Sequence, residues 1–237
     1  MKTKYKNIYD TIKNRILNKT YPPNSQIPDE ISLCEEFSCS RMTIKKALDL
    51  LVQEGLIYRK RGQGSFTMAH ATKNHRLLLQ ERELLGLSRS TKGKSTSKVI
   101  EFNLMFANKK IADILNIQEN DPIYNILRLR LIDGVPCISE RTYMPTNLIT
   151  GLSEEILENS IYDYIENTLG YRIASAQKTT RADISNDEDH KYLGLKEIEP
   201  VLEIEQIAYL DNGVPFEYSL SRHRYDYFEF TTYSIRR

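Results

Sequence analysis

Two arginines in the middle of the chain have the spacing of a charged site on one face of a β-strand. Arg128 and Arg130 lie two positions apart within the run Ile126-Leu-Arg-Leu-Arg-Leu131. Successive side chains of a strand point to opposite faces, so both guanidinium groups share one face and the leucines take the other. Paired guanidinium groups bind a dianion such as phosphate through bidentate hydrogen bonds. The alternative is that both arginines pair with surface carboxylates.

A short, well-capped helix could supply a second part of the same site. Ser160 precedes the run Ile161-Tyr-Asp-Tyr-Ile-Glu166, and its hydroxyl can accept a hydrogen bond from an N–H of the first helical turn. The first N–H groups of a helix attract anions, and Tyr162 would lie beside them. Ser160 is an equally good cap whether or not an anion binds.

Two glutamates and a histidine complete the candidate site. Glu140 and Glu217 could accept hydrogen bonds from ligand hydroxyl groups, and His223 could offer a polar edge. Tyr143 and Phe216 could offer ring surface. Other readings remain open, because Glu217 could face solvent and a single histidine is more often structural than a ligand contact.

Enzyme and metal chemistry find no support in the sequence. It contains no Ser-His-Asp order, no metal-ligand spacing and no glycine-rich nucleotide loop. Its three cysteines, Cys34, Cys39 and Cys137, include no CxxC pair, so neither a disulfide framework nor a zinc site is expected. We therefore expect no catalytic residues, no metal and no cofactor.

A different chemistry is indicated by the run from Cys39 to Gly55. Its apolar residues recur at helical spacing and form one stripe, made of Ile44, Ala47, Leu48, Leu51 and Val52. The first turn is polar and cationic, which opposes the helix dipole and suits a negatively charged partner such as nucleic-acid phosphate or a guanine edge. The candidate contacts are Ser40, Arg41, Thr43, Lys45 and Lys46. The alternative is a basic face that is only solvated.

The elements around this helix predict a winged helix-turn-helix. Residues 5–16 have helical spacing, and a second short helix is expected after Pro28-Asp29. After Gly55, residues 56–60 and 65–67 read as two strands joined by a hairpin, and its wing-tip residues are Arg61, Gly62, Gln63 and Gly64. A DNA-binding winged helix has this order: two helices, then the helix that contacts DNA, here within residues 39–55, and then a β-hairpin.

Charge and composition divide the chain into two domains. The net charge of +1 over 237 residues separates into +5 for residues 1–70 and −4 for the remainder, so the positive charge lies with the winged helix. We expect domains at 1–68 and 76–237 joined by a linker at 69–75, with a helix over 77–87 and a loop over 88–97. No apolar run is long enough to span a membrane, and the N-terminus is polar, so a cytoplasmic protein is expected.

An internal duplication predicts the fold of the second domain. The run Leu115-Asn-Ile-x-Glu119-x-x-Pro122 matches Leu193-Gly-Leu-x-Glu197-x-x-Pro200, 78 residues later, and each copy continues through a strand, an Asp-containing turn and a second strand. Because one copy cannot cover its own sheet, we expect a single antiparallel sheet with helices on one face and a cleft where the copies meet. The expected fold class is therefore α+β.

The first 68 residues resemble the GntR superfamily of bacterial transcription regulators. The resemblance rests on Tyr21-x-Pro23, Ile27-Pro28-x-Glu30, Leu33-Cys34-x-x-Phe37, Ser40-Arg41-x-Thr43-Ile44-x-x-Ala47-Leu48, Glu54-Gly55-Leu56-Ile57 and Gly62-x-Gly64-x-Phe66. It implies a winged helix that binds double-stranded operator DNA.

Residues from about 98 to 233 resemble the UTRA effector domain of the HutC subgroup, which has a chorismate-lyase-like fold. The resemblance rests on Arg128-x-Arg130-x-x-x-Asp133-Gly134-x-Pro136, Glu140-x-x-Tyr143, Asn159-Ser160-Ile161-Tyr162, Gly213-x-Pro215-Phe216-Glu217-Tyr218 and Ser221-Arg222-His223-Arg224. The motifs Asn159-Ser160-Ile161-Tyr162 and Ser221-Arg222-His223-Arg224 most resemble those of repressors of sugar operons, including the trehalose type. The resemblance implies that the matching positions bind a phosphorylated sugar.

Together these features predict a homodimeric repressor of a carbohydrate operon that reads a palindromic operator and is induced by a sugar phosphate. Two alternatives are a non-sugar small anion or metabolite as the effector, and a small-molecule enzyme related to lyases.

Overall fold

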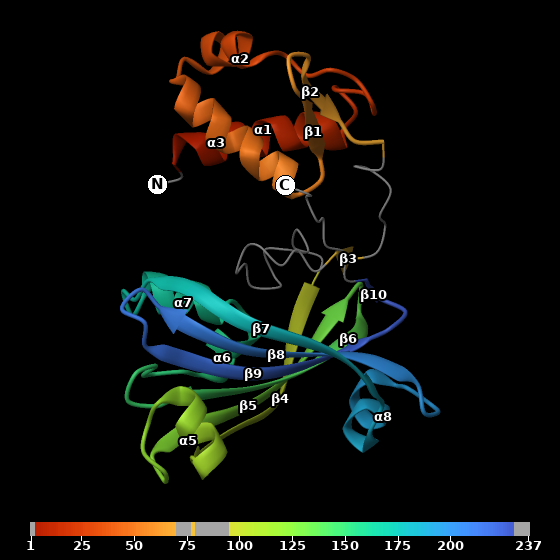
Figure 1. Ribbon diagram of the computed structural model, residues 1–237. Helices are drawn as coiled ribbons and strands as arrows, with labels where there is room; N and C mark the ends of the chain where they lie inside the picture. The colour runs from red at the N-terminus through yellow and green to blue at the C-terminus, as the bar shows by residue number, and fades with distance from the viewer. Residues whose placement is uncertain (1–2, 70–76, 79–94, 230–237) are drawn as a thin grey trace. The chain divides into compact units, whose positions relative to one another are not determined.

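The computed structural model describes residues 3–69, 77–78 and 95–229, which form two compact units (Figure 1). The first unit contains residues 3–69, and the second contains residues 77–78 and 95–229. Each unit has its own hydrophobic core.

The first unit has the predicted winged helix-turn-helix order. Its elements are α1 (Lys4–Leu17), α2 (Glu30–Phe37), α3 (Arg41–Gln53), β1 (Ile57–Lys60) and β2 (Gly64–Thr67). Ile12, Leu33 and Leu48, one from each helix, are almost completely buried in one core. The two strands pair antiparallel, with Tyr58 opposite Phe66.

Local caps fix the turn between α2 and α3. The carboxylate of Asp29 accepts a hydrogen bond from the Ser32 N–H and starts α2, which ends at Ser38 in the left-handed conformation with a φ of 45°. Ser40 then caps α3. The left-handed Gly55 follows α3, with a φ of 66°, as its sequence position predicted.

The second unit is built on a six-stranded antiparallel sheet in the order β4-β5-β6-β9-β8-β7. Its elements are β4 (Ser95–Phe106), α5 (Lys109–Leu115), β5 (Pro122–Ile132), β6 (Val135–Pro145), α6 (Glu154–Glu158), α7 (Ile161–Asn167), β7 (Ile173–Ile184), α8 (Asp187–Leu193), β8 (Pro200–Leu210) and β9 (Pro215–Arg224). A separate pair of short parallel strands is formed by β3 (Leu77–Leu78) and β10 (Phe228–Glu229).

The predicted duplication is visible as a strand, a helix and a hairpin that occur twice. The copies are β4-α5-β5-β6 and β7-α8-β8-β9, and β6 pairs with β9 where they meet. Each copy's helix packs against a strand of the other copy, α5 against β9 and α8 against β6. In the first contact, Ile111 and Leu115 of α5 share a hydrophobic cluster with Tyr218 of β9. The two copies therefore complete one another's cores.

Helices cover both faces of the sheet, which corrects the expectation of one covered face. Helices α5 and α8 lie on one side (Figure 1). On the other side, Leu157 of α6 and Ile161 and Ile165 of α7 pack with Ile126 and Phe216. The connection between the copies forms this second layer, because the strands carry side chains to be buried on both faces.

The expected helix over residues 77–87 and loop over residues 88–97 are also corrected at the residues that the structure describes. Leu77 and Leu78 form strand β3 and not the start of a helix, and residues 79–87 lie outside the described residues. Residues 95–97 begin strand β4 and are not part of a loop, and residues 88–94 lie outside the described residues. Within the described residues, no helix is long and apolar enough to cross a membrane.

Candidate functional site

The sheet face under α6 and α7 brings together five of the side chains singled out in the sequence. Arg128 and Arg130 come from β5, Glu140 from β6, and Glu217 and His223 from β9. In the strand register Arg128 lies opposite Glu140 and Ile138 lies opposite His223, and cross-strand partners point to the same face. We call these five residues the polar cluster. It draws on both copies of the duplication.

Arg128 joins β5 to β6 and to the end of α6. Its side chain is almost fully buried, and its Nη2 atom lies 2.5 Å from Glu140 Oε2. Its Nη1 atom donates to the carbonyl oxygen of Leu157, at the end of α6, over 3.1 Å. The Nε atom of Arg128 is buried without a hydrogen-bond partner among the described residues. The guanidinium group therefore retains a buried donor that could serve a ligand.

Arg130 adds a second buried positive charge to the polar cluster. It is only 4% exposed. Burial lowers the pKa of Arg130; the charge of Glu140 opposes this shift and that of Arg128 reinforces it. The ordinary pKa of an arginine is so high that the group keeps its proton. The polar cluster thus holds two buried cations around one shared carboxylate neighbour.

The two glutamates of the polar cluster have opposite electrostatic environments. Burial alone would raise the pKa of Glu140, but the charges of Arg128 and Arg130 and the hydrogen bond from Arg128 outweigh it, so this pKa is lowered. Burial and the charge of Glu140 raise the pKa of Glu217. Glu140 is therefore stabilised as a carboxylate by the two arginines, whereas Glu217 accepts its hydrogen bonds from uncharged side chains.

Those neutral donors form a network that includes two residues the sequence reading missed. Glu217 Oε1 accepts from Gln206 Nε2 at 2.7 Å, from Ser219 Oγ at 3.1 Å and from the Tyr162 hydroxyl at 3.3 Å. Gln206 Nε2 also lies 3.1 Å from the Tyr162 oxygen. The duplication could have identified both missed residues. Gln206 stands 78 residues after Arg128, and it faces Ser219 across β8 and β9 as Arg128 faces Glu140 across β5 and β6.

Ser160 caps α7, and Tyr162 packs the start of that helix against this face. The Ser160 hydroxyl accepts a hydrogen bond from the Asp163 N–H at 3.2 Å, so the predicted cap is present. The Tyr162 ring meets the ring of Phe216 edge to face, with centroids 5.9 Å apart. Phe216 is fully buried in the core beneath.

Tyr143 does not belong with the polar cluster. It lies opposite Tyr218 in the register of β6 and β9, and the two rings stack with centroids 5.9 Å apart. Both rings belong to the cluster that packs against α5, on the other face of the sheet. The expectation of a ligand contact for Tyr143 was wrong because side chains alternate along β6, and Tyr143 has the opposite parity to Glu140.

His223 is buried at the end of the polar cluster that faces β10. Its Nδ1 atom lies 3.2 Å from the Leu202 carbonyl oxygen. The ring meets Phe228 of β10 edge to face, with centroids 4.7 Å apart. Burial lowers the pKa of His223 to about 4, so the ring is neutral at pH 7.

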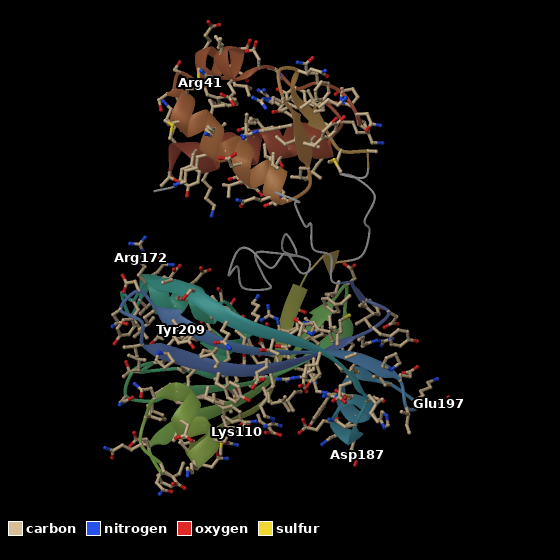
Figure 2. All side chains as sticks on the ribbon, in the orientation of Figure 1. Arg41, Lys110, Arg172, Asp187, Glu197 and Tyr209 are labelled. Carbon is tan, nitrogen blue, oxygen red and sulfur yellow. The ribbon has the colours of Figure 1, made fainter. Side chains whose placement is uncertain are left out.

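The first turn of α3 presents the predicted cationic surface. The Ser40 hydroxyl lies 3.4 Å from the Thr43 N–H and 2.9 Å from the Thr43 hydroxyl. The Arg41 side chain is 77% exposed, lies at the outside of the first unit (Figure 2) and donates from Nε to Glu30 Oε2 at 2.9 Å. Lys45 is exposed, whereas the Lys46 ammonium sits 4.1 Å from the centre of the Tyr5 ring.

The hairpin between β1 and β2 forms an exposed wing tip of Arg61, Gly62, Gln63 and Gly64. Gln26 anchors the tip, because its Nε2 donates to the Gln63 carbonyl oxygen at 2.8 Å. Gly64 has a φ of +105°, and a Cβ added there would lie 2.8 Å from the same Gln26 nitrogen. The positive φ favours glycine at this position, and a larger residue would also have to displace the Gln26 side chain from the tip. The sequence reading missed Gln26.

Two families match the chain, one for each unit. The family described as "Bacterial regulatory proteins, gntR family" matches residues 4–67, and the UTRA domain matches residues 90–229. The chain is 45% identical to the HTH-type transcriptional regulator GmuR of Bacillus subtilis strain 168, over 99% of both chains. It is 32% identical to the HTH-type transcriptional repressor NagR of the same strain, over 98% of this chain and 95% of NagR.

The crystal structure of the possible transcriptional regulator YydK from Bacillus subtilis has the same fold. It superposes with a TM-score of 0.80 at 32% identity, covering 99% of this chain and 100% of YydK. A less similar relative from Escherichia coli strain K12, 28% identical over 90% of this chain and 88% of its own length, is named a probable fructoselysine utilization operon transcriptional repressor.

The buried, neutral state of His223 predicts a pH dependence of stability. Because its folded pKa of about 4 lies below the ordinary 6.5, the unfolded chain binds the proton first as the pH falls. The stability due to neutral His223 is complete above pH 6.5 and should fall by about 3 kcal/mol by pH 4. Urea titrations at pH 7 and pH 4 should show a smaller loss in His223→Gln than in the unmodified protein. His190→Gln on α8 is the control, and an equal loss in all three proteins would contradict the assignment.

Proposed function

The chain belongs to the GntR family of bacterial regulatory proteins and carries a UTRA domain, and from this premise we propose that it represses a carbohydrate-utilisation operon until a phosphorylated sugar binds the second unit. The family and both domains identify a DNA-binding transcription regulator and not an enzyme. Regulators of this type bind DNA and a small effector at the UTRA domain. Repression of a sugar operon is supported by the names of the repressor relatives. We propose domain boundaries at 1–68 and 76–237.

For DNA binding, we propose that α3 enters the major groove. Arg41 then reads a guanine edge, Thr43 and Lys45 contact bases or backbone, and the wing tip at Gln63 reaches the minor groove. Ser40, Lys46, Arg61, Gly62 and Gly64 complete the proposed surface. Two copies of the chain, as a homodimer, would read a palindromic operator.

The effector proposal is carried by one observation, the pair of buried guanidinium groups in the polar cluster. Arg128 and Arg130 are 7% and 4% exposed, and they share the neighbouring carboxylate of Glu140. A phosphate dianion carries the charge and the acceptor oxygens that suit two neighbouring guanidinium groups. The buried Nε of Arg128 supplies a further donor.

The neutral side of the polar cluster suits the sugar part of such a ligand. Glu217, with Tyr162, offers acceptors and donors for hydroxyl groups, and Glu140 and His223 lie on the same face of the sheet. Ser160 caps the helix that carries Tyr162. We therefore propose Arg128, Arg130, Glu140, Ser160, Tyr162, Glu217 and His223 as the effector-binding residues.

We further propose that β10 carries the response toward the DNA-binding domain. His223 of the polar cluster contacts Phe228 of β10, and Phe228 lies opposite Leu77 of β3. Residues 70–76, which precede β3 in the chain, connect it to the first unit. A ligand that displaces His223 would therefore act on the strand pair at the end of the linker. Such a response requires that the ligand bind one conformation better than the other.

Replacement of Arg41 tests the placement of α3. Arg41→Ala should weaken binding to a selected operator duplex by about 1–3 kcal/mol and leave binding to unrelated duplex less affected, because a base contact is lost. Fluorescence anisotropy with both duplexes measures the difference. Arg15→Ala is the matched control, since Arg15 also pairs with a glutamate of α2, Glu36. Unchanged operator affinity in Arg41→Ala would refute the contact.

A thermal-shift screen tests the effector class. Phosphorylated mono- and disaccharides should include a compound that raises the melting temperature of the protein, and its unphosphorylated form should not, because the arginines recognise the phosphate. Arg128→Ala should abolish this shift and induction while operator binding remains. Arg141→Ala is the control, since Arg141 also pairs with a glutamate, Glu101, 2.8 Å away, but lies on the opposite face. A full shift in Arg128→Ala would place the effector elsewhere, and a hit among non-sugar anions alone would exclude the sugar.

Replacement of Phe228 tests the route through β10. Phe228→Leu keeps an apolar side chain but loses the ring edge against His223, so the effector should still bind and yet release operator less efficiently. We expect the coupling free energy to fall by about 0.5–2 kcal/mol. Operator titrations with and without the sugar phosphate found in the screen measure it. Tyr225→Leu, at an exposed position in the same turn, is the control. Equal coupling in both variants would contradict the route.

A further inference from the structure

Met42 is an apolar side chain that the recognition helix α3 leaves in solvent. It lies in the first turn of α3, and 74% of its surface is exposed. Ile44 and Ala47 of the same helix are completely buried. A single exposed hydrophobic residue is ordinary on a protein surface. The exposure of Met42 therefore indicates a binding role only because of its position on α3.

Helical geometry places Met42 on the side of α3 opposite the core. With 3.6 residues per turn, it points away from the stripe of Ile44, Ala47, Leu48 and Leu51. It shares this outward side with Lys45, Lys46 and Asp49. At helix N-termini in this fold, outward side chains are those that meet base edges in the major groove.

Three of the four charged neighbours of Met42 contact other elements of the first unit. Arg41 bonds to Glu30 of α2. The ammonium of Lys46 lies on the ring of Tyr5 in α1. Asp49 is paired with Arg59 of β1, 2.8 Å away. The middle of the outward side near the start of α3 is therefore occupied by Met42 and Lys45.

We propose that Met42 determines operator specificity by contacting the 5-methyl group of a thymine in each half-site. Thymine alone among the four bases carries a methyl group in the major groove. A thioether is at best a weak hydrogen-bond acceptor, so its selective contact is apolar, and its three rotatable bonds let it adapt to the methyl group. The inference rests on the proposed entry of α3 into the major groove.

Uracil substitution tests the contact directly, because uracil is thymine without the methyl group. A duplex selected from a randomised library by the unmodified protein is the probe, and its thymines are replaced by uracil one symmetry-related pair at a time. At one symmetry-related pair of thymines, we expect uracil to weaken binding about fourfold for each lost contact. This factor corresponds to the free energy of burying one methyl group. In Met42→Ala, the same replacement should leave affinity unchanged. Met42→Leu should keep part of the effect.

Three outcomes decide the inference. It is overturned if the unmodified protein binds every uracil duplex as tightly as the thymine duplex, or if Met42→Ala keeps the full uracil effect. Thr43 is the other candidate contact in this turn that carries a methyl group, and Thr43→Ser removes it. The inference is also overturned if Thr43→Ser abolishes the loss of affinity caused by uracil and Met42→Ala does not. Equal melting temperatures show that the variants are folded, as the exposure of Met42 leads us to expect. Arg41→Ala in the same assay separates the two proposals, since its loss of affinity tests groove entry independently of Met42.

Discussion

The burial of two guanidinium groups on one face of a sheet is the interaction on which the second unit depends. Arg128 and Arg130 are held there by the alternation of β5, which also buries Leu127 and Leu129 on the other face. Removing two cations from water costs several kcal/mol each unless partners compensate them. Glu140 supplies one negative charge, and the raised pKa of Glu217 makes a second one less favourable. We propose that this face of the sheet binds an anion such as the phosphate group of the effector.

Duplication explains how a single sheet can offer unlike halves to one ligand. Arg128 and Glu140 in the first copy correspond to Gln206 and Ser219 in the second, so a charged pair faces a neutral pair across the junction of β6 and β9. The segment containing α6 and α7 follows the first copy only, and it covers this face. Because each copy's helix packs against a strand of the other copy, the two halves are joined in one sheet and its covering layers. A phosphate end and a hydroxyl-rich end of one ligand match this asymmetry.

Much of this arrangement could be predicted from local patterns. The winged helix followed from caps, helical spacing and the glycine hairpin, and the sheet followed from the repeat, because each signal lies within a short stretch of sequence. Alternation placed Arg128 and Arg130 together but was not applied to Tyr143, which lies on the opposite face. The second helical layer was missed, as were the hydrogen bonds made by Gln206 and Gln26, because all of them depend on contacts between distant segments. The partner of Arg41, Glu30 of α2, was missed for the same reason.

We propose that an anion in the polar cluster and operator DNA on the first unit favour different conformations of one chain. Linkage requires that each ligand change the affinity of the other by the same factor. Calorimetric titration of the sugar phosphate into the protein, with and without saturating operator duplex, measures that factor directly. Saturating operator should weaken sugar-phosphate binding by the same factor by which the sugar phosphate weakens operator binding. Equal affinities in the two titrations would contradict it.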